Sequence, residues 1–230
     1  MALRLLLDSA DPAAWAEWLP SGLLQGVTTN PTLLRRAAVP CRLDQLERLT
    51  REALNLGMQE IHLQAWGNDA GDLTHCGTAL AGLAKGQVLV KLPITRAGAE
   101  AARRLIDSGV PVTFTACYAA PQVLLAAALG ARYIAPYLGR IGDLGCDGHA
   151  ELVAMQQALD GVGSSTRLLV ASLRHCSDLT RLAAAGLSCF TLAPSVLREL
   201  FSVAPTLEAA AQFERDAMAG ADTAAPEQDR

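Results

Sequence analysis

The chain has 230 residues, of which 51% are hydrophobic and 18% are charged, and its formal net charge is −4. This length and apolar content suit one domain with a sizeable core. No apolar run approaches the roughly 20 residues that span a bilayer. The run after Arg4 is too short, and too soon followed by Asp8, for a secretory signal. We therefore expect a cytoplasmic protein with no membrane partner.

The charged and metal-ligating residues argue against further classes of partner. A negative net charge without a clustered basic stripe excludes nucleic acid as the main partner. The four histidines and six cysteines show neither metal-ligand spacing nor a C-x-x-C pair, so we expect reduced thiols and no metal site. Only Lys85 and Lys91 are lysines among 19 basic residues, so each marks a place where the chain departs from its preference for arginine.

Short apolar runs rich in β-forming residues alternate along the chain with longer helical patterns. Each run has four to seven residues, the usual length of a strand. On this basis we predict eight strands: Arg4–Asp8, Gly26–Thr29, Glu60–Trp66, Val88–Leu92, Val112–Ala116, Tyr133–Tyr137, Arg167–Ser172 and Cys189–Leu192.

Helix signals fill the segments between these strands. Apolar residues recur at helical spacing in Leu43–Leu56. Thr95 is expected to cap a helix that continues through Arg104, with Gly109 just past its end. Glycine also follows two other helical stretches, which is typical of helix ends. Further helices are predicted over Pro121–Leu129, ending at Gly130, over Ser177–Ala185, ending at Gly186, and over Pro205–Met218.

Eight strands that alternate with helices predict a parallel sheet, and eight is the number that closes a (β/α) barrel. We therefore predict an α/β fold, a single (β/α)8 TIM barrel over residues 1–218 with an extra C-terminal helix at 205–218. Residues 219–230 are expected to form a disordered tail. An open doubly wound sheet remains an alternative, although the nucleotide-binding patterns G-x-G-x-x-G and G-x-x-x-x-G-K-[ST] are absent.

Polar or ionisable side chains stand at the carboxyl ends of nearly all predicted strands. Barrel enzymes build their active sites at this end, and a barrel made only for stability would not need polar residues there. The residues at or just after these ends are Asp8, Thr29, Asn30, Gln64, Lys91, Thr115, Tyr137, Ser172 and Arg174.

Lys91 carries the sharpest chemical signal. It lies within Val88–Ile94, an apolar run that should be buried on both faces, and lysine is rarely buried without a reason. Burial disfavours the ammonium form and leaves a neutral amine that can attack a carbonyl. The alternative is a lysine whose amine reaches solvent or pairs with a carboxylate.

The other strand-end residues allow two interpretations each. Asp8 suits a proton carrier, but it could instead cap a helix near Asp11–Pro12. Gln64 interrupts an apolar strand and needs hydrogen-bond partners if buried. Tyr137 suits a phenol donor or a core position. His62 is not assigned to the site.

Arg140 and Arg174 follow the sixth and seventh predicted strands. Loops after late barrel strands often bind phosphate, and paired guanidinium groups suit a phosphate dianion. The alternative for each arginine is a surface salt bridge.

Four motifs resemble the short transaldolase and fructose-6-phosphate aldolase family, and they keep its order and spacing over most of Leu5–Met218. They are G-V-T-T-N-P-T at 26–32, V-K-L-P-I-T at 90–95, A-P-Y-L-G-R-I at 135–141 and A-S-L-R at 171–174. The resemblance implies a (β/α)8 barrel that uses no metal or organic cofactor. It also implies sugar phosphate substrates and a homo-oligomer, in this family often of stacked pentameric rings joined through a C-terminal helix, here Pro205–Met218.

The resemblance assigns roles to the strand-end residues. It implies a Schiff base on Lys91, with Asp8 handling the proton of a substrate hydroxyl. Roles for the remaining residues follow from the same motifs: a catalytic water at Tyr137, Gln64 and Thr115, the dihydroxyacetone portion at Asn30 and Ser172 beside Thr29, and the phosphate at Arg140 and Arg174.

The family has two branches, which residues at four positions distinguish, those of Gln64, Thr113, Ala135 and Tyr137. Gln64, Ala135 and Tyr137 match the aldolase branch, where transaldolases usually carry Glu, Ser and Phe. Thr113 fits neither branch, and Gly139 is closer to transaldolases, as is Arg174. We expect cleavage of fructose 6-phosphate to dihydroxyacetone and glyceraldehyde 3-phosphate.

Other functions remain open from the sequence. The first alternative is a transaldolase of the pentose phosphate pathway, which transfers dihydroxyacetone from fructose 6-phosphate to erythrose 4-phosphate. Another Schiff-base barrel, such as a deoxyribose phosphate aldolase, is disfavoured by the G-V-T-T-N-P and A-S-L-R segments. A non-catalytic phosphosugar-binding barrel is disfavoured by the presence of Lys91, Asp8 and Tyr137.

Overall fold

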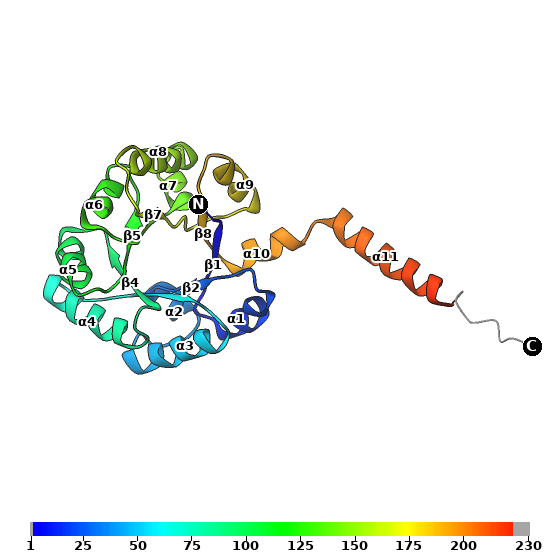
Figure 1. Ribbon diagram of the computed structural model, residues 1–230, viewed down its shortest axis with the longest axis horizontal. Helices are drawn as coiled ribbons and strands as arrows, with labels where there is room; N and C mark the ends of the chain where they lie inside the picture. The colour runs from blue at the N-terminus through cyan, green and yellow to red at the C-terminus, as the bar shows by residue number, and fades with distance from the viewer. Residues whose placement is uncertain (1, 223–230) are drawn as a thin grey trace, which may run out of the picture.

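A computed structural model describes residues 2–222 and contains a parallel β-barrel surrounded by helices (Figure 1). The eight strands form one sheet in the order β7-β6-β5-β4-β3-β2-β1-β8. They are β1 (Arg4–Asp8), β2 (Gly26–Thr28), β3 (Glu60–Gln64), β4 (Val88–Pro93), β5 (Val112–Cys117), β6 (Tyr133–Pro136), β7 (Arg167–Leu168) and β8 (Cys189–Leu192).

Helices follow the strands and form an outer ring, with α2 and α7 drawn inside that ring in Figure 1. The helices are α1 (Pro12–Trp18), α2 (Pro31–Arg36), α3 (Leu43–Asn55), α4 (Ala70–Gly82), α5 (Arg96–Asp107), α6 (Gln122–Leu129), α7 (Leu138–Asp143), α8 (Gly148–Gly161), α9 (Cys176–Ala184), α10 (Pro194–Phe201) and α11 (Ala204–Asp222), with a 3-10 turn at Leu19–Ser21.

The sheet closes on itself. β1 pairs in parallel with both β2 and β8. Between β7 and β8 the closure runs through a parallel bridge of Val170 with Phe190, where the Val170 N–H donates to the Cys189 carbonyl at 2.9 Å. This closure confirms the predicted (β/α)8 TIM barrel and excludes an open doubly wound sheet.

The alternation of side chains along each strand decides which residues face the barrel interior. Lys91 pairs in register with Gln64 on one side and with Thr113 on the other. Because neighbouring side chains point to opposite faces, Leu89 shares the face of Lys91. The interior holds a small apolar cluster of Leu6, Leu89, Tyr133, Ala135, Leu169 and Cys189, separate from the larger core between sheet and helices.

The predicted helix ends are largely confirmed. The Thr95 hydroxyl accepts the Gly98 N–H at 3.1 Å and caps α5, which continues to Asp107 rather than ending at Arg104. Gly130 and Gly186 follow α6 and α9 with φ angles of 73° and 93°. Such left-handed conformations favour glycine.

Four predicted strands are shorter in the structure: β2 and β6 end one residue early, at Thr28 and Pro136, and β3 and β7 lose more. β3 ends at Gln64, two residues before Trp66. β7 contains only Arg167–Leu168, although the Leu169 N–H still donates to the Ile134 carbonyl at 2.8 Å. Ser172 has a φ of 60°, a left-handed conformation that cannot continue a strand. Between these points, Val170 and Ala171 form only isolated bridges, with Phe190 and Tyr137.

The C-terminal helix extends away from the barrel as an arm (Figure 1). α11 spans Ala204–Asp222, four residues beyond the predicted end at Met218. Residues 219–222 are therefore helical, and the rest of the expected tail, 223–230, lies outside the described residues. Across residues 2–222, the helices include none with the length and apolar character needed to cross a membrane.

A buried carboxylate closes the amino-terminal end of the barrel. Glu60, at the start of β3, is 2% exposed. It is paired with Arg4 and with Arg132, the latter at 3.3 Å, and it accepts the Tyr133 hydroxyl at 3.0 Å. Burial and the charge of Glu60 raise the pKa of Tyr133 to about 12, so its hydroxyl remains a donor.

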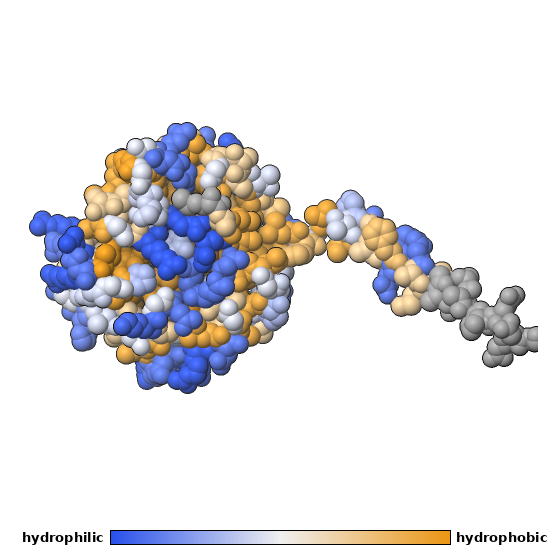
Figure 2. Space-filling view, viewed as in Figure 1, coloured by the Kyte–Doolittle hydropathy of each residue, from blue (hydrophilic) through white to orange (hydrophobic). Residues whose placement is uncertain are grey.

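Figure 2 shows hydrophilic residues over the middle of the barrel and hydrophobic residues where the arm begins.

We expect Glu60→Gln to lower the free energy of unfolding by about 1–3 kcal/mol, because an amide cannot neutralise the two guanidinium groups that remain. Urea unfolding followed by circular dichroism measures the change. Glu47→Gln is the matched control, since Glu47 forms an exposed ion pair with Arg51 and its loss should cost at most about 0.5 kcal/mol. Equal effects for the two variants would contradict the importance of the buried network.

Candidate active site

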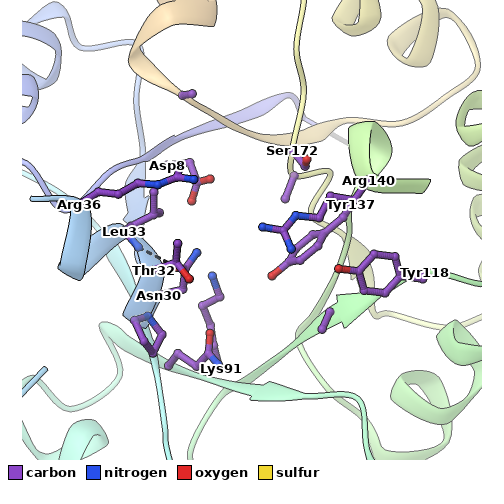
Figure 3. A pocket seen from close by; sticks show the side chains of 15 residues that line it. Asp8, Asn30, Thr32, Leu33, Arg36, Lys91, Tyr118, Tyr137, Arg140 and Ser172 are labelled. Carbon is purple, nitrogen blue, oxygen red and sulfur yellow. Dashed lines mark hydrogen bonds between the residues drawn. The ribbon is translucent and has the colours of Figure 1, made fainter. Parts of the chain in front are cut away.

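A cavity of about 450 Å³ opens at the carboxyl ends of the strands. Figure 3 shows Lys91 pointing into it, with Asp8 on one side and Tyr137 on the other. Most of the predicted site residues line this cavity: Asp8, Asn30, Gln64, Lys91, Tyr137, Arg140 and Ser172.

Lys91 lies deep in the cavity. Its side chain projects from β4 into the barrel, and the residue is only 4% exposed. The Nζ atom donates to the Thr29 carbonyl at 2.8 Å. Burial lowers the pKa of Lys91, and the negative charge of Asp8 opposes this effect. The buried amine is therefore easier to deprotonate than an exposed lysine, as a nucleophile requires.

Asp8 ends β1 and shares the cavity with Lys91. Its carboxylate accepts the Thr28 hydroxyl at 2.6 Å, and the cap of α1 is Asp11, whose carboxylate accepts the Ala13 N–H. Asp8 therefore does not act as the helix cap. Burial raises the pKa of Asp8, while the charge of Lys91 and the Thr28 hydrogen bond oppose the rise. A carboxylate with a raised pKa exchanges protons nearer to neutral pH.

Tyr137 stands across the cavity from Asp8 and is hydrogen-bonded to Thr115. The two hydroxyl oxygens are 2.7 Å apart. Burial raises the pKa of Tyr137, and the hydrogen bond with Thr115 partly offsets the rise. The Tyr118 ring meets the Tyr137 ring edge-on, with centroids 5.6 Å apart, and the Arg140 guanidinium lies 5.5 Å from the Tyr137 centroid. The burial and the raised pKa keep the phenol protonated at neutral pH.

Asn30 and Ser172 offer polar groups to the cavity from opposite parts of the barrel. The Asn30 Oδ1 caps α2 by accepting the Leu33 N–H at 2.9 Å, so its amide NH₂ is left to donate to a ligand. Ser172 has a φ of 60°, and Ala116, also in the cavity wall, has a φ of 57°. Left-handed conformations of residues other than glycine cluster at functional sites.

The remaining predicted site residues lie outside the cavity wall. Thr29 is 1% exposed and contributes its carbonyl to Lys91. Thr115 is also 1% exposed and reaches the cavity only through Tyr137. Arg174 is exposed and forms an ion pair with Asp143. Gly139 lies close to this segment, because a Cβ there would lie 2.6 Å from the Ser172 carbonyl oxygen and 2.7 Å from the Arg174 Nε.

Thr113, whose role the sequence leaves open, hydrogen-bonds a histidine inside the barrel. Its hydroxyl lies 2.9 Å from the His62 Nδ1, and neither residue is exposed. Burial holds the pKa of His62 well below its ordinary value, and the positive charge of Lys91 contributes in the same direction. His62 is therefore neutral, and the pair joins β3 and β5, the two strands that flank the strand of Lys91.

Sequence reasoning missed three polar side chains of the cavity wall, Thr32, Arg36 and Tyr118. Arg36 ends the short helix α2, and Tyr118 follows β5 by one residue. The six residues of α2 are too few for a periodic pattern, so no sequence signal separates Arg36 from its neighbour Arg35. Tyr118 could have been found, because it closely follows a predicted strand.

The cavity brings together an amine, a carboxylate, a phenol and arginine side chains. Such a set can form a covalent intermediate with a carbonyl compound, move protons around it and bind an anionic group. Within residues 2–222, there is no group of three or more His, Cys, Asp or Glu side chains that could hold a metal ion.

Comparison with known proteins gives matches over almost the whole chain. The family model described as "Transaldolase/Fructose-6-phosphate aldolase" matches residues 5–228. A "Probable transaldolase" of Phenylobacterium zucineum (strain HLK1) is 33% identical over 214 residues, covering 93% of this chain and 96% of the relative. A "Probable transaldolase" of Rhodospirillum centenum (strain ATCC 51521 / SW) is 33% identical over 215 residues, covering 93% and 90%. The chain therefore belongs to the transaldolase/fructose-6-phosphate aldolase family.

Proposed function

We propose that this protein forms a Schiff base on Lys91 with a ketose phosphate and cleaves off or transfers a dihydroxyacetone unit. The observation that carries the proposal is the buried Lys91 amine in the cavity, with Asp8 and Tyr137 on either side. The V-K-L-P-I-T motif at 90–95 supports the same lysine.

The reaction begins when the neutral Lys91 amine attacks the keto carbon of the sugar. Loss of water gives an iminium, which can accept an electron pair from a neighbouring bond. Asp8 then takes the proton of the C4 hydroxyl, and the bond between C3 and C4 breaks. An aldehyde such as glyceraldehyde 3-phosphate leaves, and the electron pair of that bond forms an enamine of dihydroxyacetone on Lys91.

The polar residues around Lys91 suit the rest of the substrate. Asn30 and Ser172 hold the hydroxyl groups of the dihydroxyacetone portion, next to the Thr29 carbonyl. Arg140 and Arg174 hold the phosphate, and for Arg174 this requires its guanidinium to leave or share Asp143. A dianion can compete for such an exposed ion pair, because exposed pairs contribute only about 0–1 kcal/mol.

The fate of the enamine decides which of two activities dominates. Protonation and hydrolysis release dihydroxyacetone, which is aldolase activity. The phenol of Tyr137 is hydrogen-bonded to Thr115 and lines the same cavity as Gln64, and it suits the activation of the water that this step needs. We therefore propose fructose 6-phosphate cleavage as the main activity.

Transfer of the enamine to a second aldehyde is the alternative activity. The curated relatives at 31–33% identity carry the name "Probable transaldolase", which favours this candidate. In this reaction the enamine attacks the aldehyde carbon of erythrose 4-phosphate and forms a new iminium on Lys91. Hydrolysis of that iminium by water releases sedoheptulose 7-phosphate and regenerates the amine.

The proposal predicts that purified protein releases free dihydroxyacetone from fructose 6-phosphate without any acceptor. Free dihydroxyacetone and sedoheptulose 7-phosphate are both measured, with and without erythrose 4-phosphate. Turnover only with the acceptor would identify a transaldolase, and no turnover in either case would contradict both activities.

Tyr137→Phe is the informative variant in the same assay. It removes the phenolic hydroxyl and keeps the ring against Tyr118. Dihydroxyacetone release should fall at least about 10-fold more than transfer, since a general acid or base contributes about 10²–10⁴-fold. Tyr118→Phe is the control, because no hydrogen bond of its hydroxyl occurs within residues 2–222. An unchanged ratio of the two activities would exclude Tyr137 as the determinant.

The charge of Asp8 gives a prediction for the pH dependence of Schiff base formation. Asp8 raises the pKa of Lys91, so Asp8→Asn should lower that pKa further. The rate of labelling by dihydroxyacetone and borohydride should then rise and level off at a lower pH than in the wild type. Intact-mass spectrometry across a pH series measures the rate. A shift toward higher pH would contradict the proposed pairing of charges.

We also propose that the protein is a homo-oligomer that assembles through α11, as in the stacked pentameric rings of the family. Every residue from Phe201 to Ala219 is exposed, including Leu207, Phe213 and Met218. Large apolar side chains that stay exposed within residues 201–219 mark an interaction surface.

The double variant Leu207→Glu/Phe213→Glu should reduce the molar mass in light scattering, because charges on these side chains oppose their burial. Glu208→Gln/Glu214→Gln, on the same helix, is the control and should keep the wild-type mass. A wild-type mass for the first variant would exclude these two side chains from the interface.

A further inference from the structure

Arg36 is a cation of the cavity wall to which no motif assigns a role. It is the last residue of α2, the helix that Asn30 caps. Its position on this helix places it on the wall opposite Arg140, which belongs to α7. Figure 3 shows the two arginine side chains entering the cavity from these opposite walls.

The charges around the cavity leave these two arginines without carboxylate partners. Arg174 pairs with Asp143, and Arg198 pairs with Glu17. Among residues 2–222, no carboxylate oxygen lies within 4.0 Å of a side-chain nitrogen of Arg36 or Arg140. Two unpaired guanidinium groups that face one cavity attract a doubly charged anion, because each can donate two parallel hydrogen bonds.

Arg36 could instead act on the chemistry through Asp8. Its charge does lower the pKa of Asp8, but the charge of Lys91 and the hydrogen bond from Thr28 have larger effects. Arg36 is also exposed, and solvent and salt weaken the effect of an exposed charge. The position of Arg36 on the cavity wall therefore favours a direct contact with an anionic ligand over an effect on the pKa of Asp8.

We propose that Arg36 is a specificity-determining residue that, together with Arg140, binds the terminal phosphate of the sugar substrate across the mouth of the cavity. This inference rests on the proposed function and adds a contact to those that the family motifs assign. It makes α2, through Asn30 at its start and Arg36 at its end, a substrate-recognition element. Substrates without a phosphate gain nothing from Arg36.

Arg36→Gln tests the proposal, with Arg35→Gln as the matched control. Arg35 is the preceding residue on α2, is also exposed and does not line the cavity. Arg36→Gln should raise the KM for fructose 6-phosphate about 10- to 100-fold, the usual effect of losing a charge-assisted hydrogen bond to a dianion. The kcat should stay within about 2-fold, and kcat/KM for unphosphorylated fructose should stay unchanged. Arg35→Gln should match the wild type with both sugars.

Two kinetic outcomes would overturn the assignment. Equal losses of kcat/KM with fructose 6-phosphate and fructose would mean that Arg36 acts through Asp8 or Lys91. Unchanged kinetics with both sugars would mean that Arg36 does not contact the substrate.

Calorimetric binding of inorganic phosphate separates this inference from the proposed activity, because it needs no turnover. Phosphate should bind the wild type and Arg35→Gln alike and Arg36→Gln at least about 10-fold more weakly. The wild type could bind phosphate in this way but neither cleave fructose 6-phosphate nor transfer dihydroxyacetone from it. In that case the proposed function is wrong, while the role of Arg36 in anion binding stands. Equal phosphate binding by Arg36→Gln and the wild type would refute the role of Arg36 alone.

Discussion

The burial of the Lys91 amine is the constraint on which the rest of the site depends. An ammonium group loses its hydration inside a barrel, so the fold must supply a partner, deprotonate the amine or do both. Here the Thr29 carbonyl accepts the Nζ hydrogen bond, and Asp8 is the nearby counter-charge. Asp8 limits the fall in the pKa of Lys91, and Lys91 limits the rise in the pKa of Asp8. Each charge therefore favours the charged form of the other residue, against the larger effect of burial.

The two ends of the barrel solve the problem of buried charge differently. At the amino-terminal end, Glu60 is neutralised by Arg4 and Arg132, and it accepts a hydrogen bond from Tyr133. These partners stabilise the carboxylate in a structural role. At the carboxyl end, Lys91 and Asp8 share the cavity without a direct ion pair among the described contacts. Both groups of charged residues face the interior of the barrel. The structural group lies at the amino-terminal end of the strands, and the reactive group lies at the carboxyl end.

The strands and the cavity could be predicted from the sequence because buried parallel strands read as short apolar runs. Their polar ends then identified most of the polar side chains of the cavity wall, including Lys91, Asp8 and Tyr137. The prediction was less accurate where tertiary contacts determine the end of a strand or the partner of a side chain. The left-handed conformation of Ser172 excludes this residue from the predicted seventh strand. The ion pair of Arg174 with Asp143 joins two segments that no sequence pattern relates. Arg36 was missed because a helix of six residues has too little periodicity to reveal which face meets the cavity.

Reductive trapping tests the central claim most directly, since the chain has only two lysines, Lys91 and the exposed Lys85. The protein is incubated with fructose 6-phosphate and borohydride, digested and analysed by peptide mass spectrometry. A Schiff base on the buried amine predicts a reduced sugar adduct on the peptide that contains Lys91 and none on the peptide that contains Lys85. Full turnover with no adduct on Lys91, or an adduct on Lys85 alone, would contradict the account.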